Sequence, residues 1–254
     1  MNVKRSETSV SSSISFLSPI QIVFSFQLKL TTKQINRTKS TTQHLNNNTA
    51  MQSLLYIEAS PRKDASTSIA VSKAFLDEFQ RTNPSTQIST INLYETQLPE
   101  FNGPTIDAKY AILTGQPHSD EQKLAWQKVE TLITEFKKAD KIVFSVPMWN
   151  FGIPYVLKHY IDVIVQPGYT FSYTPGEGYK GLVLGKPVLL ICSRGGAYGP
   201  ESEVDFQKSY METVLKFIGF TDIRTILVEP TMSPNKSEVL KTAIQMADEM
   251  AKKF

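Results

Sequence analysis

The chain of 254 residues contains very little cysteine and histidine. Cys192 is its single cysteine, which excludes an intramolecular disulfide and a cysteine-based zinc cluster. The three histidines, His44, His118 and His159, stand far apart and form neither an HxxxH nor an HExxH spacing. The sequence therefore predicts no metal site. Because Cys192 ends an apolar run, we expect an inert, buried thiol there.

Two nucleotide-binding motifs and a strongly basic surface are also missing. There is no GxGxxG and no GxxxxGK[ST], so the dinucleotide fingerprint and the P-loop are both absent. The net charge of +3 is uneven: residues 1–50 carry six Lys or Arg and one acid, which leaves 21 basic and 23 acidic residues, a net of −2, in 51–254. Residues 51–254 therefore do not resemble a nucleic-acid-binding protein.

Residues 1–50 lack a convincing membrane span and differ in composition from the rest. Their apolar stretch, residues 14–30, is interrupted by polar residues and Pro19, so it would cross a bilayer poorly. The segment is basic, rich in Ser and nearly free of acids, which allows a targeting peptide or a disordered tail. The favoured interpretation is that it is a non-native extension, because Met51 stands directly before the first credible strand. None of these three interpretations places catalytic or binding residues in this segment.

What the chain does contain, from Met51 onward, is a regular alternation of strand and helix patterns. Strands are expected at 54–59, 87–93, 141–146, 187–192 and 223–228, and helices at 68–80, 119–138, 154–164, 204–218 and 237–252. Segments 98–118 and 166–185 are expected to be loops, because Gly and Pro punctuate them. Residues 51–254 are therefore predicted to form one α/β domain. Its sheet is flavodoxin-like, with five parallel strands in the order 2-1-3-4-5 and helices on both faces.

A hydroxyl-rich loop, residues 60–68, follows the first strand and leads into the first helix. Ser60, Ser66, Thr67 and Ser68, together with free N–H groups at the helix N-terminus, suit a phosphate. A helix N-cap would explain one of these hydroxyls, but not four. The loop has no glycine-rich wrapping and no lysine aimed at a γ-phosphate, so a monophosphate is favoured over a nucleoside triphosphate.

An aromatic turn, residues 148–151, follows the central strand after Pro147. Met148, Trp149, Asn150 and Phe151 combine apolar and aromatic faces with one amide, as a flat heterocycle requires. An apolar turn that merely caps the core is the alternative interpretation.

A glycine loop, residues 193–196, follows the fourth strand and consists of Ser193, Arg194, Gly195 and Gly196. Paired glycines allow a backbone to approach a ligand closely and to present N–H groups to its polar edge, although a plain glycine turn is also possible. All three loops are expected at one edge of the sheet. A phosphate site, a ring wall and a polar backbone edge together indicate flavin mononucleotide (FMN).

These motifs carry a resemblance to a known family. Residues 53–252 resemble the FMN-dependent NADH:azoreductase/quinone reductase family of flavodoxin-like proteins. The matching motifs are S-x5-S-x-S at residues 60–68, M-[YW]-N-F at 148–151, S-R-G-G at 193–196 and G-x-T-F-x-Y at 168–173. Two positions depart from the family pattern: Thr67 stands where Gln is common, and Trp149 where Tyr is common.

The resemblance implies a role for each loop. Ser60, Ser66, Thr67 and Ser68 would hold the phosphate, Met148, Trp149, Asn150 and Phe151 would lie against the isoalloxazine, and Ser193, Arg194, Gly195 and Gly196 would line its pyrimidine edge. No side chain is expected to be catalytic, because the chemistry belongs to flavin N5. Phe151, Phe171 and Tyr173 are candidates for stacking against substrate, and each could equally be core.

The resemblance also implies a cytoplasmic homodimer with one non-covalent FMN per subunit. NADH or NADPH would donate electrons, and a quinone or azo compound would accept them in a ping-pong, two-electron (hydride) transfer. The alternative is a flavodoxin-type electron carrier that docks protein partners. Such carriers tend to be strongly acidic, and a net charge of −2 argues against one. A flavin-binding scaffold without turnover is a third interpretation. The physiological acceptor and the preference between NADH and NADPH stay open.

Overall fold

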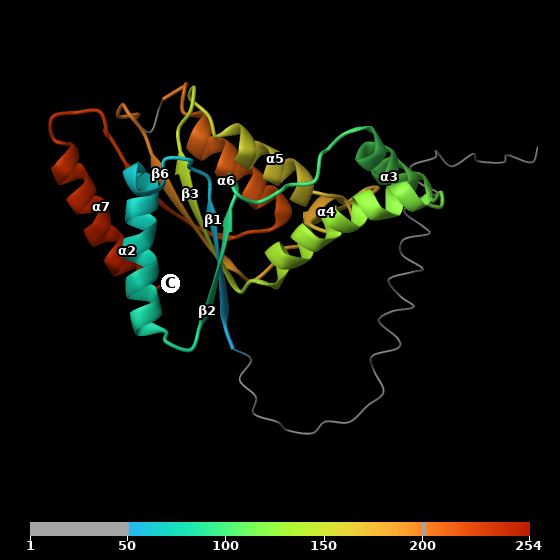
Figure 1. The fold of residues 1–254 in the computed structure, drawn as a ribbon, viewed down its shortest axis with the longest axis horizontal. Coiled ribbons are helices and arrows are strands. Elements are labelled where there is room, and N and C mark those ends of the chain that lie inside the picture. The colour runs from blue at the N-terminus through green and yellow to red at the C-terminus, as the bar shows by residue number, and fades with distance from the viewer. Residues whose placement is uncertain (1–50, 200–201) are drawn as a thin grey trace, which may run out of the picture.

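The computed structural model describes residues 51–199 and 202–254, so the predictions for residues 1–50 lie outside the described chain. A parallel sheet of five strands forms its centre, in the order β2-β1-β3-β6-β7 (Figure 1). The strands are β1 (Ser53–Glu58), β2 (Gln87–Asn92), β3 (Lys141–Pro147), β6 (Pro187–Ser193) and β7 (Asp222–Val228). Counted within this sheet, the order is 2-1-3-4-5, so the predicted flavodoxin-like topology is confirmed.

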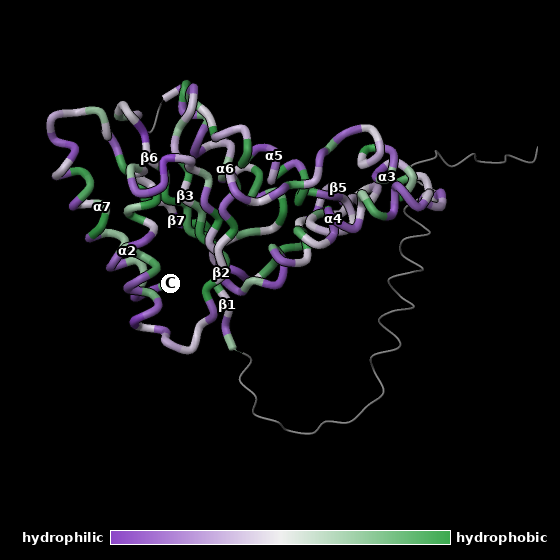
Figure 2. Tube along the Cα trace, viewed as in Figure 1, coloured by the Kyte–Doolittle hydropathy of each residue, from purple (hydrophilic) through white to green (hydrophobic). Residues whose placement is uncertain are grey.

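Helices cover both faces of the sheet, as a parallel sheet requires. α2 (Thr67–Thr82) and α7 (Lys236–Ala251) pack on one face, and α4 (Asp120–Lys138), α5 (Tyr155–Ile164) and α6 (Phe206–Ile218) on the other (Figure 1). Strand side chains alternate between the two layers: Leu54 and Tyr56 face α2 and α7, whereas Leu55 and Ile57 face the other helices. Figure 2 shows the resulting hydrophobic strands between helices of mixed hydropathy.

The segment 98–118 is not a loop throughout, and this prediction was wrong. It contains the helix α3 (Gly103–Thr114), which packs against α4. Pro104 lies in the first turn, where its missing N–H costs nothing, and Gly115 ends the helix with a φ of 69°. The residues that suggested a loop are therefore the two ends of a helix.

The segment 166–185 contains a second element that the sequence did not reveal. β4 (Phe171–Thr174) and β5 (Gly178–Gly181) form an antiparallel hairpin outside the main sheet. The hairpin packs on the end of α6: Val183 N donates to Ile218 O at 2.9 Å, and a Cβ built on Gly181 would lie 2.3 Å from Gly219 N. Because α6 runs back from the carboxyl ends of the strands, the hairpin lies at their amino ends.

Two further findings concern the described ranges as a whole. Within residues 51–199 and 202–254, no helix combines the length and the apolar character needed to cross a bilayer. In the same ranges, no three His, Cys, Asp or Glu side chains are grouped so that they could bind a metal ion.

Candidate functional site

Three loops meet at the carboxyl ends of β1, β3 and β6, which we call the carboxyl edge. β3 lies between β1 and β6 and pairs in parallel with both. The hydroxyl loop (60–68), the aromatic turn (148–151) and the glycine loop (193–196) therefore begin side by side. Met148 N donates to Ser193 O at 2.8 Å and joins the last two directly. The structure thus brings the three predicted loops together.

The hydroxyl loop presents side chains that helix capping does not use. Ser60, Ser66 and Ser68 are buried, and Thr67 is half-buried. Ser66 stands at the N-cap position of α2, yet its hydroxyl accepts no backbone N–H. Instead, its Oγ lies 3.2 Å from Ser68 Oγ. The first turn of α2 contains no acidic residue, so its free N–H groups and positive dipole end remain suited to an anion.

Two of the cations around the hydroxyl loop, Lys63 and Lys73, are already paired. Lys73 Nζ lies 2.6 Å from Asp64 Oδ1, and Lys63 Nζ lies 2.7 Å from Glu95 Oε1. Glu58 ends β1 beneath the loop; burial raises the pKa of its carboxyl, and the nearby Lys73 opposes that rise. Recognition of a phosphate here would therefore depend on hydroxyls and backbone N–H groups, with the exposed Arg62, which forms no ion pair among the described residues, as the remaining cation of the loop.

The aromatic turn is held in a strained conformation. Trp149 N donates to Gly152 O at 3.0 Å and Gly152 N donates to Trp149 O at 2.9 Å. The two central residues, Asn150 and Phe151, have φ values of 46° and 68°. Two positive φ values define a type I′ turn, which normally selects Asn and Gly. Asn150 suits its place, whereas Phe151 costs roughly 1–2 kcal/mol there.

This strain is stabilised from outside the turn. Phe206 N, at the start of α6, donates to Phe151 O at 3.1 Å. The side chains of Trp149 and Phe151 are 37% and 51% exposed, so the turn forms an open aromatic wall and does not cap the core. A strained backbone that presents exposed rings is typical of a binding site.

The glycine loop presents free backbone donors. Among the described residues, the N–H groups of Gly195 and Gly196 have no acceptor. The carbonyl of Gly195 accepts from Met232 N at 3.1 Å, which orients the peptide. These two donors can therefore face the polar edge of a ligand.

Arg194 has a different place from its neighbours in the loop. Its side chain is 1% exposed; Nε donates to Gln207 Oε1 at 2.8 Å and Nη1 to Glu229 Oε2 at 3.3 Å. Nη2 lies 2.7 Å from Asp205 Oδ2, an ion pair without hydrogen-bond geometry. Its backbone N and O are also paired, with Val228 and Thr231. Arg194 therefore anchors the glycine loop to α6 and to the segment after β7, and its direct contact with a ligand stays a prediction.

The candidates for stacking against substrate are not together in one chain. Phe151 lies in the aromatic turn, whereas Phe171 and Tyr173 lie on the hairpin at the amino ends of the strands, which we call the amino edge. There, Phe171 packs against Phe217 with ring centroids 4.7 Å apart, and Tyr173 against Tyr179 at 5.0 Å. Within a single chain, only Phe151 reaches the three loops.

Sequence reasoning missed two aromatic residues at the carboxyl edge. Tyr94, just after β2, has its ring centroid 6.3 Å from that of Trp149 and 6.3 Å from that of Tyr155, at the start of α5. Trp149 and Tyr155 are themselves 6.5 Å apart. The available signal was positional: Tyr94 follows the end of a parallel strand, as the predicted residues do.

Cys192 is buried on β6, and burial raises the pKa of its thiol to about 12. The thiol therefore stays protonated and is a poor nucleophile, as expected for a structural cysteine.

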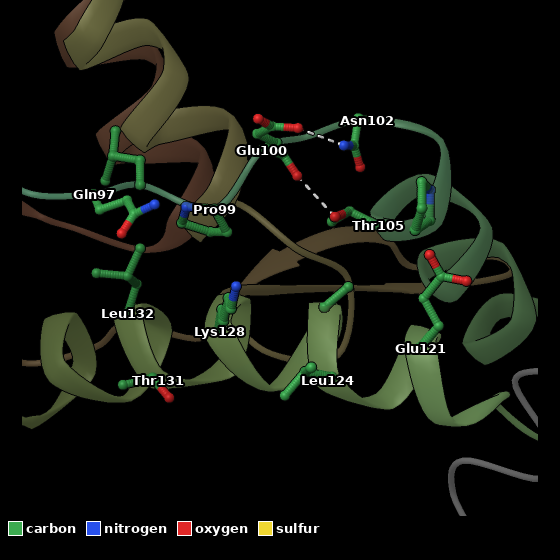
Figure 3. A pocket seen from close by; sticks show the side chains of 13 residues that line it. Gln97, Pro99, Glu100, Asn102, Thr105, Glu121, Leu124, Lys128, Thr131 and Leu132 are labelled. Atoms are coloured by element: carbon green, nitrogen blue, oxygen red, sulfur yellow. Dashed lines mark hydrogen bonds between the residues drawn. The ribbon is translucent and has the colours of Figure 1, made fainter.

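A separate hollow of about 530 Å³ lies between α4 and the segment joining β2 to α3 (Figure 3). It is lined by Leu98, Leu124, Lys128 and Leu132, among others. Glu100 lies at its rim and accepts hydrogen bonds from Asn102 and Thr105. It contains none of the residues of the three loops.

Known proteins match almost the whole described chain. A family model described as flavodoxin-like fold matches residues 52–251. An FMN-dependent NADH:quinone oxidoreductase of Desulfotalea psychrophila is 47% identical over 208 residues, which cover 80% of this chain and 98% of the relative. A protein of the same name from Nitratidesulfovibrio vulgaris is 44% identical over 210 residues, covering 80% and 100%.

Solved structures agree with these relatives. An azoreductase from Bacillus anthracis superposes with a TM-score of 0.75 at 31% identity and covers 80% of this chain and 100% of its own. An FMN-dependent NADH-azoreductase from the same species, solved in complex with FMN, gives 0.74 at 30% identity, with 80% and 99% covered. The chain belongs to the flavodoxin-like family that includes the FMN-dependent NADH:quinone oxidoreductases and azoreductases.

Proposed function

We propose that this protein is an FMN-dependent NAD(P)H oxidoreductase that reduces quinones and azo compounds. The observation that carries the proposal is the convergence of three kinds of ligand-binding group at the carboxyl edge. Hydroxyls that cap no helix, an exposed aromatic wall and free glycine N–H groups fit the phosphate, the flat ring and the polar ring edge of FMN, respectively. Family membership points to the same cofactor and donor.

Each loop has a defined part in holding the cofactor, which we propose to bind non-covalently, one per subunit. Ser60, Ser66, Thr67 and Ser68 bind the phosphate with the first-turn N–H groups of α2. Met148, Trp149, Asn150 and Phe151 lie against the ring. Ser193, Gly195 and Gly196 lie at its pyrimidine edge, with Arg194 fixing the loop from behind.

In this proposal the chain positions FMN and tunes its reactivity, and it offers no nucleophile. Bound FMN supplies the hydride-transfer chemistry. The N–H groups of Gly195 and Gly196 are fixed before any ligand arrives, and a preorganised donor of this kind contributes about 3 kcal/mol to stabilising developing negative charge. The aromatic wall covers one side of the site, so we propose that the donor and the acceptor use the same open side in turn, a ping-pong order.

We further propose that the protein works as a cytoplasmic homodimer, without nucleic-acid or membrane partners. Large apolar side chains are exposed at both edges of the sheet: Phe151, Tyr155, Phe206, Tyr179 and Leu184. A second copy would bury such surfaces. Light scattering coupled to size-exclusion chromatography tests this, and a monomer at all concentrations contradicts it.

The function is tested by the absorbance spectrum and the turnover of purified protein. We expect bound flavin and continuous NADH oxidation that depends on an added quinone. An electron carrier would bind flavin without sustained turnover of small molecules. Colourless protein that also fails to bind added FMN contradicts the whole proposal.

A further inference from the structure

Three aromatic rings from three segments meet beside the aromatic turn. Tyr94 comes from the segment after β2, Trp149 from the turn itself and Tyr155 from the first turn of α5, and each ring contacts the other two. Trp149 and Tyr155 are 37% and 69% exposed, whereas Tyr94 lies partly beneath the protein surface. Tyr94 is thus the inner member of the cluster, and one of the two outer members, Trp149, belongs to the aromatic turn.

The hydroxyl of Tyr94 is buried and has no hydrogen-bond partner among the described residues. An unpaired buried hydroxyl forfeits about 1–3 kcal/mol relative to one that is hydrogen-bonded or hydrated. Such groups are rare in folded proteins, and each calls for an explanation. The hydroxyl stays protonated at neutral pH, because burial and the nearby Tyr155 raise its pKa. It is therefore a donor without an acceptor.

The position of this donor suggests what it is for. Its ring contacts Trp149, which directly precedes the strained Asn150–Phe151 pair. FMN carries only oxygen and nitrogen acceptors at its phosphate, ribityl chain and ring edge. The rings of Trp149 and Tyr155 lie at the surface, so a displacement of either ring by a ligand would uncover the hydroxyl.

We propose that Tyr94 completes the cofactor site: its hydroxyl donates a hydrogen bond to bound FMN after the Trp149 or Tyr155 ring moves aside. This inference rests on the proposed FMN-binding function. It assigns a binding role to a residue that no motif of the sequence marks. It also gives the unpaired hydroxyl of Tyr94 an acceptor.

The chain provides a matched control. Tyr160, on α5, also has a buried hydroxyl without a partner among the described residues, but it is fully enclosed in the core beside Phe136. Tyr94→Phe and Tyr160→Phe each remove one unpaired hydroxyl and retain the ring. Only Tyr94 lies next to the three loops.

The test measures both variants with and without FMN. Urea unfolding of the FMN-free proteins should show each variant as stable as the wild type, or more so. Titration by flavin fluorescence should show FMN binding weakened about 2- to 12-fold in Tyr94→Phe, the effect of one neutral hydrogen bond. In Tyr160→Phe the dissociation constant should stay within about twofold of the wild type.

Each other result has a definite meaning. Unchanged FMN affinity in Tyr94→Phe, with normal binding by the wild type, overturns the inference and leaves the proposed function intact. Lower stability of FMN-free Tyr94→Phe also overturns it, because the hydroxyl then has a partner within the protein. A raised KM for NADH with unchanged FMN affinity reassigns the contact and contradicts the inference. If the wild type itself binds no FMN, the proposed function fails.

Discussion

The polar groups of the three loops at the carboxyl edge differ in their partners from a group of lysines and an aspartate at the amino edge. At the amino edge, lysine side chains donate hydrogen bonds to backbone carbonyls. Lys186 donates to Lys137 O and Ala139 O, and Lys141 donates to the carbonyl of Phe254. Asp140 accepts from Ser53 N at 2.8 Å in the same region. At the carboxyl edge, by contrast, the Ser66 hydroxyl caps nothing and the Tyr94 hydroxyl and glycine N–H groups lack acceptors among the described residues.

The difference separates stability from function. Buried polar groups that are paired internally hold the fold together, and buried groups that are left unpaired reduce its stability unless a ligand binds them. Changes at the amino edge should therefore alter unfolding, and changes at the carboxyl edge should alter cofactor binding. Four predictions test this division, in order of decreasing effect.

The largest effect is expected from a negative charge in the hydroxyl loop. Ser66→Asp keeps a good N-cap for α2 but places a carboxylate next to the phosphate of FMN. Two unit charges about 4 Å apart repel by about 4 kcal/mol at a surface-like dielectric, so FMN affinity should fall about 1000-fold. Riboflavin, which has no phosphate, is the control ligand and should bind as it does to wild type. Equal losses for both ligands would show that the loop does not hold the phosphate.

A pair of glycine substitutions compares the two edges directly. In Gly181→Ala at the amino edge, the new Cβ would lie 2.3 Å from the backbone of Gly219. We expect the free energy of unfolding to fall by about 3 kcal/mol and Tm to be about 6–12 °C lower.

In Gly195→Ala the Cβ meets Met232 Sδ at 3.0 Å, and Met232 is 89% exposed and can move. Here Tm should change by less than about 2 °C, while FMN affinity falls. Calorimetry measures Tm and titration measures FMN affinity for both variants. A large loss of Tm in Gly195→Ala together with a loss of FMN affinity alone in Gly181→Ala would contradict the assignment of stability to the amino edge and cofactor binding to the carboxyl edge.

A smaller effect is expected at the strained turn. Asn150→Ala should lower kcat about tenfold and change FMN affinity less than about threefold, because the phosphate anchors the cofactor elsewhere. Alanine is also disfavoured at the φ of 46° found here. Asn150→Gly, which accepts that φ, is therefore the matched control for the backbone. Equal rates for all three proteins at saturating FMN would show that the amide has no role.

The smallest effect is expected from removing residues 1–50. A protein that starts at Met51 should fold, dimerise and bind FMN like the full chain, with Tm within about 1–2 °C. Insoluble protein or loss of flavin would show that the segment is structural. A Met1 N-terminus on protein isolated from its natural cell would contradict the interpretation of a non-native extension.

The sequence predicted the sheet well, because each strand is a short apolar run between turn residues. It failed at α3, whose Pro104 and Gly115 resemble loop punctuation although they are helix ends. It could not show the type I′ turn, since Asn150–Phe151 lacks the glycine that usually marks one. The anchoring of Arg194 by Gln207 and Glu229, and the cluster around Tyr94, depend on residues distant in sequence, so only the fold reveals them.

The single cysteine has a consequence for chemical durability. Quinones are electrophiles that alkylate thiolates, so a protein that processes them risks modifying itself. Cys192 is the only thiol of the chain, and it is buried with a pKa of about 12. An enzyme built in this way offers its own quinone substrates no thiolate to attack.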